Sequence, residues 1–224
     1  MINQPMPPTQ TPGIGEKQII RLEAFKERLK KREIWINGPL DETLVEKLYI
    51  NLIDLEAQSN VIPLTVVINS TGGNFFEAIV GTDIMGTLNC PVKTIALANA
   101  CSGGFILFMG GQERIVHDYS CLMMHSIGFG VVDKVPDVAE RLEYIEQAQT
   151  KMAKFFAYQT RNKTTSDYWE KLFKSGKDKW FSVDEALKLG IAHKVIRRPE
   201  MINPDFNVRK PYTWDLLDIV RSQQ

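Results

Sequence analysis

Short apolar segments alternate with amphipathic segments along most of this chain, from about residue 17 to about residue 197. Several of the apolar segments end in glycine, proline or asparagine turns, which is typical of strands buried in a sheet. We expect strands at residues 33–36, 64–69, 92–98, 114–116, 121–125 and 192–197. Helices are expected between most of them, at about residues 19–29, after a cap at Asp41, from residues 72–73 to Leu88, and at about 102–109, 166–174 and 182–189. Alternation of this kind predicts an α/β fold with parallel strand pairs.

One of the expected helices is much longer than the others. Apolar residues recur at a spacing of three or four at Val138, Leu142, Ile145, Ala148, Met152 and Phe156. This spacing is that of an α-helix. It predicts one helix over about residues 134–161, roughly 40 Å long at about 1.5 Å per residue. A helix of that length is expected to protrude from a domain of this size.

The charge balance and the cysteine count exclude several classes of partner. The 27 Lys and Arg residues equal the 27 Asp and Glu residues, so bulk electrostatics predict no nucleic-acid and no membrane-surface partner. The three cysteines form no CxxC pair and no Cys/His metal spacing, which predicts neither a disulfide framework nor a metal site. No apolar run approaches the roughly 20 residues that span a bilayer, and no secretory signal is recognisable. We therefore expect a cytoplasmic protein without metal or cofactor.

The two ends of the chain differ in composition from its middle. Residues 1–16 are rich in Pro, Thr and Gly and are expected to form a flexible segment. Residues 17–197 carry the alternating pattern and are expected to form one domain. The tail at 198–224 is expected to dock through an apolar patch made of Tyr212, Trp214, Leu216, Leu217, Ile219 and Val220.

Two glycine turns that join a strand to a helix could carry chemistry. The first, Asn-Ala-Cys-Ser-Gly-Gly-Phe at residues 99–105, places Ser102 at a helix N-terminus, where free N–H groups favour negative charge. The second, Ser-Thr-Gly-Gly at residues 70–73, could donate backbone N–H groups to an oxyanion. Each also has a plainer interpretation. The first could be only a cap and a tight turn, and the second a glycine turn or a phosphate loop, although the phosphate-loop lysine is absent.

His125 and Asp178 complete the set of candidate residues. His125 ends an apolar strand and, taken alone, is better interpreted as a core histidine. Asp178 lies in a basic loop and, taken alone, is better interpreted as a solvated surface charge. His117 and His193 have no motif around them. The order of the elements along the chain, a glycine turn followed by Ser, His and Asp, is more specific than any one of them.

In this order the elements resemble the ClpP family of self-compartmentalising serine peptidases. That family has a Ser-Pro-Gly-Gly turn, a nucleophile in Ala-Ser-Met-Gly, a Met-Ile-His strand end, and an Asp just before an aromatic residue and a Ser-x-x-Glu-Ala helix. The corresponding segments here are Ser-Thr-Gly-Gly at 70–73, Cys-Ser-Gly-Gly at 101–104, Met-Met-His at 123–125 and Asp-Lys-Trp-Phe-Ser-Val-Asp-Glu-Ala at 178–186. Residues 189–192 are similar to the family's closing helix and strand, and the resemblance covers roughly residues 20–197.

The resemblance implies a ClpP/crotonase-like fold of repeated ββα units, with the long helix as a protruding handle. It implies Ser102 as the nucleophile, His125 as the general base and Asp178 as the orienting acid. The N–H groups of Gly73 and Gly103 would form the oxyanion hole. The resemblance further implies a homo-oligomer of stacked heptameric rings, which cleaves peptides or unfolded protein inside a chamber.

Assembly and acid placement follow from the same resemblance. The apolar stripe of the handle is wider than one domain needs, so we expect Val138, Leu142, Ile145 and Met152 to be buried against a partner subunit across a ring–ring interface. The alternative is that the stripe packs within its own subunit. If Asp178 does not orient the histidine, the nearest alternatives are Asp184 and Glu185.

The chain departs from the family pattern at several places. Thr71 stands where the family usually has Pro, and Gly103 where it usually has Met, and neither change removes a backbone donor. The N-terminal segment lacks the axial-hairpin pattern, and residues 64–67 lack the tyrosines of the chaperone-docking pockets. An AAA+ unfoldase therefore stands only as a candidate partner.

Two other function classes stay open at this point. One is a ClpP-like subunit with a structural or regulatory role and weak catalysis. The other is a crotonase-type acyl-CoA enzyme, because that superfamily shares the fold without needing an ordered Ser–His–Asp set. The filled triad positions favour the serine peptidase.

Overall fold

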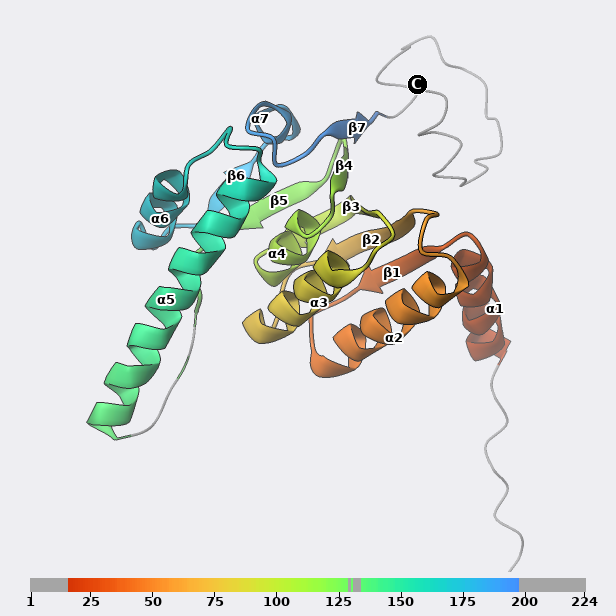
Figure 1. The fold of residues 1–224 in the computed structure, drawn as a ribbon, viewed down its shortest axis with the longest axis horizontal. Coiled ribbons are helices and arrows are strands. Elements are labelled where there is room, and N and C mark those ends of the chain that lie inside the picture. Colours follow the sequence, from red (N-terminus) through yellow and green to blue (C-terminus); the bar gives the residue numbers. More distant parts are fainter. Residues whose placement is uncertain (1–15, 129, 131–133, 198–224) are drawn as a thin grey trace, which may run out of the picture.

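The computed structural model describes residues 16–128, 130 and 134–197, and within them helices alternate with strands (Figure 1). In chain order the elements are α1 (Glu16–Lys30), β1 (Glu33–Asn37), α2 (Glu42–Gln58), β2 (Leu64–Ser70), α3 (Phe75–Thr87), β3 (Val92–Cys101), α4 (Gly103–Met109), β4 (Glu113–His117), β5 (Cys121–Met124), α5 (Val135–Gln159), α6 (Ser166–Lys174), β6 (Lys179–Phe181), α7 (Val183–Lys188) and β7 (Lys194–Ile196). The predicted α/β fold is confirmed. The predicted flexible segment, apart from Glu16, and the apolar patch of the tail lie outside the described residues.

The described strands form one mixed sheet that divides at β3. Strands β1, β2, β3, β4 and β7 are neighbours in that order, and all of these pairs are parallel. The first part of β3 pairs with β4, whereas its last residues, from Asn99 to Cys101, pair with β5. Strand β6 then adds to β5 in the antiparallel direction. The end of β3 therefore lies directly beside β5.

Helices α2, α3 and α4 lie side by side over one face of the sheet (Figure 1). Helix α2 begins after Asp41, whose side chain accepts the Leu44 N–H at 2.8 Å, as the capping pattern predicts. Its inner face buries Val45, Leu48, Leu52 and Leu55. Strand β2 is an almost continuous apolar run and is buried along nearly its whole length, which is typical of a parallel strand covered on both faces. The principal core therefore lies between these helices and the sheet.

Helix α5 is the long helix that the spacing predicts, and its first turns extend beyond the body of the domain (Figure 1). Ile145 and Met152 are buried inside their own subunit. This corrects the expectation that a partner buries them, because the apolar spacing shows that a face is covered but not what covers it. Leu142 is 47% exposed and stays available for a partner.

A cluster of aromatic side chains joins the elements that will form the site. Phe105 of α4 packs on Phe156 of α5 and on Phe181 of β6, with ring centroids 5.5 and 5.6 Å apart. Trp169 of α6 lies 4.9 Å from Phe156 and donates its indole N–H to the Thr164 hydroxyl at 2.7 Å. The cluster thereby fixes α4 relative to β6.

Replacement of Trp169 by alanine is expected to lower the free energy of unfolding by roughly 3–5 kcal/mol, because it leaves a cavity in this cluster and removes the hydrogen bond to the Thr164 hydroxyl. Chemical denaturation followed by circular dichroism measures the change. Trp180 is the matched control: it is 56% exposed on β6, and its alanine variant should lie within about 0.5–1 kcal/mol of wild type. Equal losses for the two variants would contradict this account of the core.

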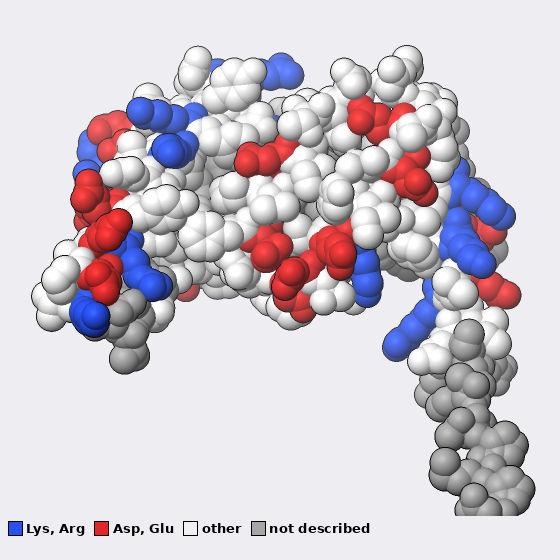
Figure 2. Space-filling model, turned by 60° about the horizontal axis from the view of Figure 1, so that its bottom comes forward, with Lys and Arg blue, Asp and Glu red and all other residues white. Residues whose placement is uncertain are grey.

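The surface carries charges of both signs. Figure 2 shows acidic and basic side chains on one face of the molecule, with several acidic groups gathered along its lower edge. That face is not uniformly basic, in keeping with the zero formal net charge. Among the described helices, none is both long and apolar enough to cross a membrane.

Candidate active site

Ser102 lies at the junction where β3 ends and α4 begins, in a backbone conformation that few residues adopt. Its φ of 54° and ψ of −120° lie outside the regions favoured by residues with a side chain. The Ser102 N–H donates to the Met123 carbonyl at 2.8 Å, and its own carbonyl accepts from Phe105 and Ile106. Its side chain makes no capping hydrogen bond to α4. These backbone hydrogen bonds hold Ser102 in a strained conformation, and its hydroxyl group makes no hydrogen bond to the helix.

The glycine turn after β2 packs against this junction without side chains. A Cβ atom on Gly72 would lie 2.7 Å from the Ser102 Cβ, and one on Gly73 would collide with the Leu40 backbone. Both glycines have positive φ, 111° and 153°. Glycine is therefore required at both positions by space and by conformation.

Two backbone N–H groups beside Ser102 have no partner. Leu40 donates to the Gly72 carbonyl at 2.8 Å and accepts from Asn74 at 2.9 Å, so the N–H of Gly73 points to the other side of the turn. Gly103 is the first residue of α4, where N–H groups have no partner within the helix. In the described part of the chain neither N–H donates a hydrogen bond. The two lie close together, because a Cβ built on Gly103 is 3.5 Å from the Gly73 nitrogen.

His125 follows β5 directly and shares a cavity with Ser102. The cavity has a volume of about 380 Å³ and is also lined by Gly73 and Gly103, the two candidate oxyanion-hole residues. Its apolar lining comes from Phe75, Phe76, Ile106, Met124, Ile127 and Ile145. Nδ1 of His125 contacts the Ser126 carbonyl, and the Ile127 N–H donates to the Gln149 side chain of α5 at 2.9 Å. Helix α5 therefore holds the segment that carries the histidine.

Asp178 stands outside this cavity, exposed to solvent, and makes no hydrogen bond to His125 in the structure. It immediately precedes β6, a strand that the sequence analysis did not anticipate. In the antiparallel β5–β6 ladder, Met124 pairs with Lys179. One further step of this register would set His125 directly opposite Asp178, at the spacing of a cross-strand pair. The structure therefore brings Ser102 and His125 together in one cavity. Asp178 lies one residue pair beyond the end of the β5–β6 ladder.

The two alternative acids are engaged elsewhere. Glu185 pairs with Lys179 at 2.7 Å, and Asp184 is 88% exposed at 3.7 Å from Arg197. Neither is aligned with His125 by the strand register. Asp178 is therefore the carboxylate best placed to reach the imidazole.

Cys101 precedes Ser102 and is the other potential nucleophile at this junction. The side chain is 4% exposed. Burial, reinforced by the neighbouring Cys121, raises the pKa of the Cys101 thiol above its ordinary value. The thiol stays protonated at neutral pH and does not compete with the serine.

Comparisons with known proteins find similarity to Clp proteases. A family model described as Clp protease matches residues 16–199. The chain is 28% identical over 183 residues to the ATP-dependent Clp protease proteolytic subunit 2 of Corynebacterium efficiens, covering 80% of this chain and 88% of that protein. It is 28% identical over 169 residues to subunit 3 of Rhodococcus jostii, covering 75% and 82%. It is 26% identical over 180 residues to subunit 2 of Bifidobacterium longum, covering 80% and 85%.

Proposed function

The chain belongs to the Clp protease family, and from this membership we propose that it is a serine endopeptidase whose nucleophile is Ser102. The observation that carries the proposal is the strained junction that presents the Ser102 hydroxyl to the cavity that His125 also lines. His125 serves as the general base and Asp178 as the acid that orients it. Gly73 and Gly103 supply the oxyanion hole.

The reaction follows from where these groups lie. The Ser102 oxygen attacks the peptide carbonyl while His125 takes up the hydroxyl proton. The N–H groups of Gly73 and Gly103 then stabilise the negative charge that develops on the carbonyl oxygen, which two unpaired donors can do without reorganising. His125 returns its proton to the leaving amine, and water repeats the sequence to release the acyl group.

Asp178 can reach His125 when strands β5 and β6 pair over one more residue. When the β5–β6 ladder is extended by one pair, Asp178 replaces the Ser126 carbonyl as the acceptor for Nδ1 of His125. This exchange fixes the imidazole tautomer in which Nε2 faces Ser102. We propose that assembly of subunits favours the extended ladder, because α5 both protrudes from the domain and holds the His125 segment through Gln149.

The cavity lining makes the substrate preference testable. Apart from His125, none of the described residues that line the Ser102 cavity carries an ionisable side chain. A charged substrate side chain just before the cleaved bond would lose its hydration in this cavity without gaining an oppositely charged partner. We therefore expect fluorogenic peptides with Leu, Met or Phe at this position to exceed those with Asp or Lys by at least about 100-fold in kcat/KM. Equal rates would contradict this cavity as the substrate site, and an absence of hydrolysis of all peptides would favour a non-catalytic subunit.

We further propose a homo-oligomer of stacked heptameric rings that encloses peptide or unfolded-protein substrates, with an AAA+ unfoldase as the candidate partner. The names of the relatives, which describe proteolytic subunits of an ATP-dependent protease, support this proposal. Exposed apolar side chains on α5, including Val135, Leu142 and Tyr144, are available for the contact between subunits.

Replacement of Leu142 by aspartate is expected to yield smaller, folded particles, because an unpaired charge is costly in an apolar interface and harmless on an exposed helix face. Sedimentation velocity with circular dichroism measures both properties. The matched control is Thr150→Asp, which adds the same charge at another exposed position of α5 and should keep the wild-type size. A Leu142→Asp particle of wild-type size would show that this part of α5 lies outside the interface.

A further inference from the structure

A buried arginine outside the Ser102 cavity has no carboxylate partner among the described residues. Arg114 of β4 is 1% exposed. Its guanidinium donates to the carbonyls of Gly111, Gln159, Gly190 and Ile191 at 2.6–2.9 Å. These carbonyls stand at or just beyond the ends of α4, α5 and α7, where helix dipoles are negative. Among the described residues, the positive charge of Arg114 is therefore balanced only by backbone carbonyls near the C-terminal ends of helices.

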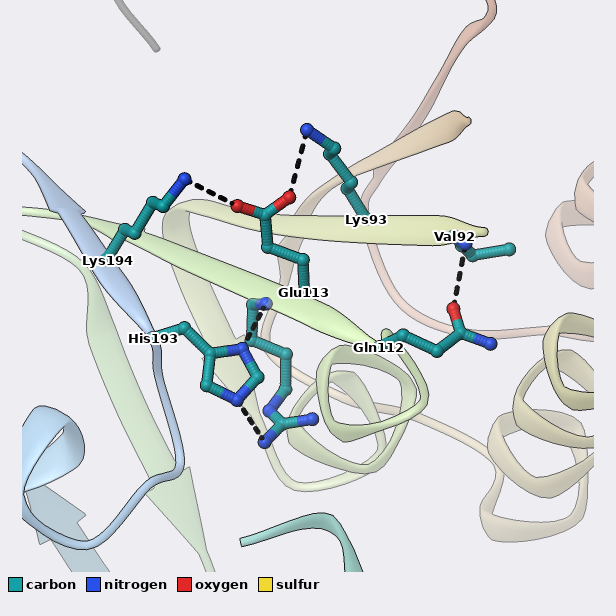
Figure 3. A network of polar contacts seen from close by, with 7 residues as sticks. Val92, Lys93, Gln112, Glu113, His193 and Lys194 are labelled. Atoms are coloured by element: carbon teal, nitrogen blue, oxygen red, sulfur yellow. Dashed lines mark hydrogen bonds and ion pairs between the residues drawn. The ribbon is translucent and has the colours of Figure 1, made fainter. Parts of the chain in front are cut away.

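His193 places a further donor beside this guanidinium. Its Nδ1 accepts the Arg114 backbone N–H at 3.0 Å, and its Nε2 lies 3.2 Å from Nη2 of the same arginine (Figure 3). Burial, together with the charges of Arg114 and Arg161, lowers the pKa of His193 to about 4, so the ring is neutral at pH 7. A neutral ring whose Nδ1 accepts must carry its hydrogen on Nε2.

Two N–H hydrogens of Arg114 and His193 have no acceptor among the described residues. Both Nη2 hydrogens of Arg114 already point to carbonyls, those of Gln159 and Gly190. The hydrogen on His193 Nε2 therefore faces another donor. One hydrogen on Nη1 is also unmatched, because that nitrogen makes a single hydrogen bond, to Gly111. These hydrogens lack an acceptor oxygen, and beside a guanidinium a carboxylate or phosphate oxygen accepts the strongest, charge-assisted hydrogen bonds.

These donors border a cavity of about 570 Å³, and none of the described residues that line it is acidic. Its polar lining includes Arg114, His193, Gln112 and the exposed Arg161, and Phe155 and Tyr158 contribute aromatic surface. The nearby Glu113 is already paired with Lys93 and Lys194, each at 2.9 Å (Figure 3). This cavity shares no lining residue with the Ser102 cavity.

We propose that this second cavity binds a small organic anion. Its carboxylate or phosphate group accepts hydrogen bonds from His193 and Arg114 and pairs with Arg161, and its apolar part contacts Phe155 and Tyr158. The site is separate from the proposed peptidase chemistry and does not depend on it.

Isothermal titration of the full chain with benzoate and with inorganic phosphate, at constant ionic strength, tests the proposal. We expect saturable binding of one anion per subunit, unchanged in the Ser102→Ala protein because the two cavities are separate. Tighter benzoate binding would assign an aromatic carboxylate, and tighter phosphate binding would assign a phosphate compound. Absence of saturable binding for both anions would overturn the proposal.

Three variants locate the binding. His193→Asp places a carboxylate where the anion would sit, so it should lose at least about tenfold in affinity while staying folded by circular dichroism. Arg161→Gln, at an exposed position that folding does not need, should lose about tenfold. Lys47→Gln on α2 changes the net charge equally and should bind as wild type. Unchanged affinity in Arg161→Gln, or an equal loss in Lys47→Gln, would show that the anion binds elsewhere or only through bulk charge.

Discussion

Replacement of Ser102 by alanine is expected to lower peptide hydrolysis on the order of 10⁶-fold in kcat, the scale at which serine triads lose activity without their nucleophile. The fold should not change, because the Ser102 side chain makes no capping hydrogen bond and alanine tolerates the positive φ about as poorly as serine does. Fluorogenic peptide turnover measures the loss, with circular dichroism as the test of folding.

Cys101→Ala is the matched control for this variant. It removes the neighbouring potential nucleophile, whose thiol is buried and protonated. We expect its activity to stay within about tenfold of wild type, since only packing changes. Full activity in Ser102→Ala, or loss confined to Cys101→Ala, would contradict the assignment of the nucleophile.

Replacement of Asp178 by asparagine is expected to cost on the order of 10⁴ in kcat, because an amide favours the wrong imidazole tautomer while it preserves the shape of the site. The size of this loss tests the one-pair extension of the β5–β6 ladder, since an Asp178 that never reaches His125 would contribute little. Steady-state kinetics of the assembled protein provide the measurement.

The neighbouring acids serve as controls for Asp178. Asp184→Asn removes a carboxylate that is 88% exposed and should retain activity within about threefold of wild type. A loss below about tenfold in Asp178→Asn, accompanied by a large loss in Glu185→Gln, would transfer the orienting role to Glu185.

The sequence predicts the helices in which apolar residues recur regularly over several turns, and it predicts the turns that require glycine. The helix expected at residues 166–174 is found as Ser166–Lys174, and the long helix expected at 134–161 is found as Val135–Gln159. The glycine turn and the Ser102 junction also lie side by side, as the ordered motifs imply. The helices depend on local chemistry, which a single sequence contains, whereas the contact between the two turns was implied by the resemblance to the ClpP family.

Features that depend on distant partners could not be predicted in the same way. Strand β6 has only three residues, too few for a period, and it exists because it pairs with β5. The sequence therefore placed Asp178 in a loop, although one further pair of the β5–β6 ladder would set it opposite His125. His193 had no motif because its partner, Arg114, lies 79 residues away in the chain. The apolar stripe of α5 likewise could not show that Ile145 packs within its own subunit.

The central claim is that Ser102 is an activated nucleophile, and fluorophosphonate labelling tests it most directly. The purified assembled protein is treated with the probe, digested and mapped by mass spectrometry. The account predicts one covalent adduct per subunit, on Ser102, and its loss when His125 is replaced by alanine. An absence of labelling in a folded, assembled protein, or an adduct on a different serine, would contradict it.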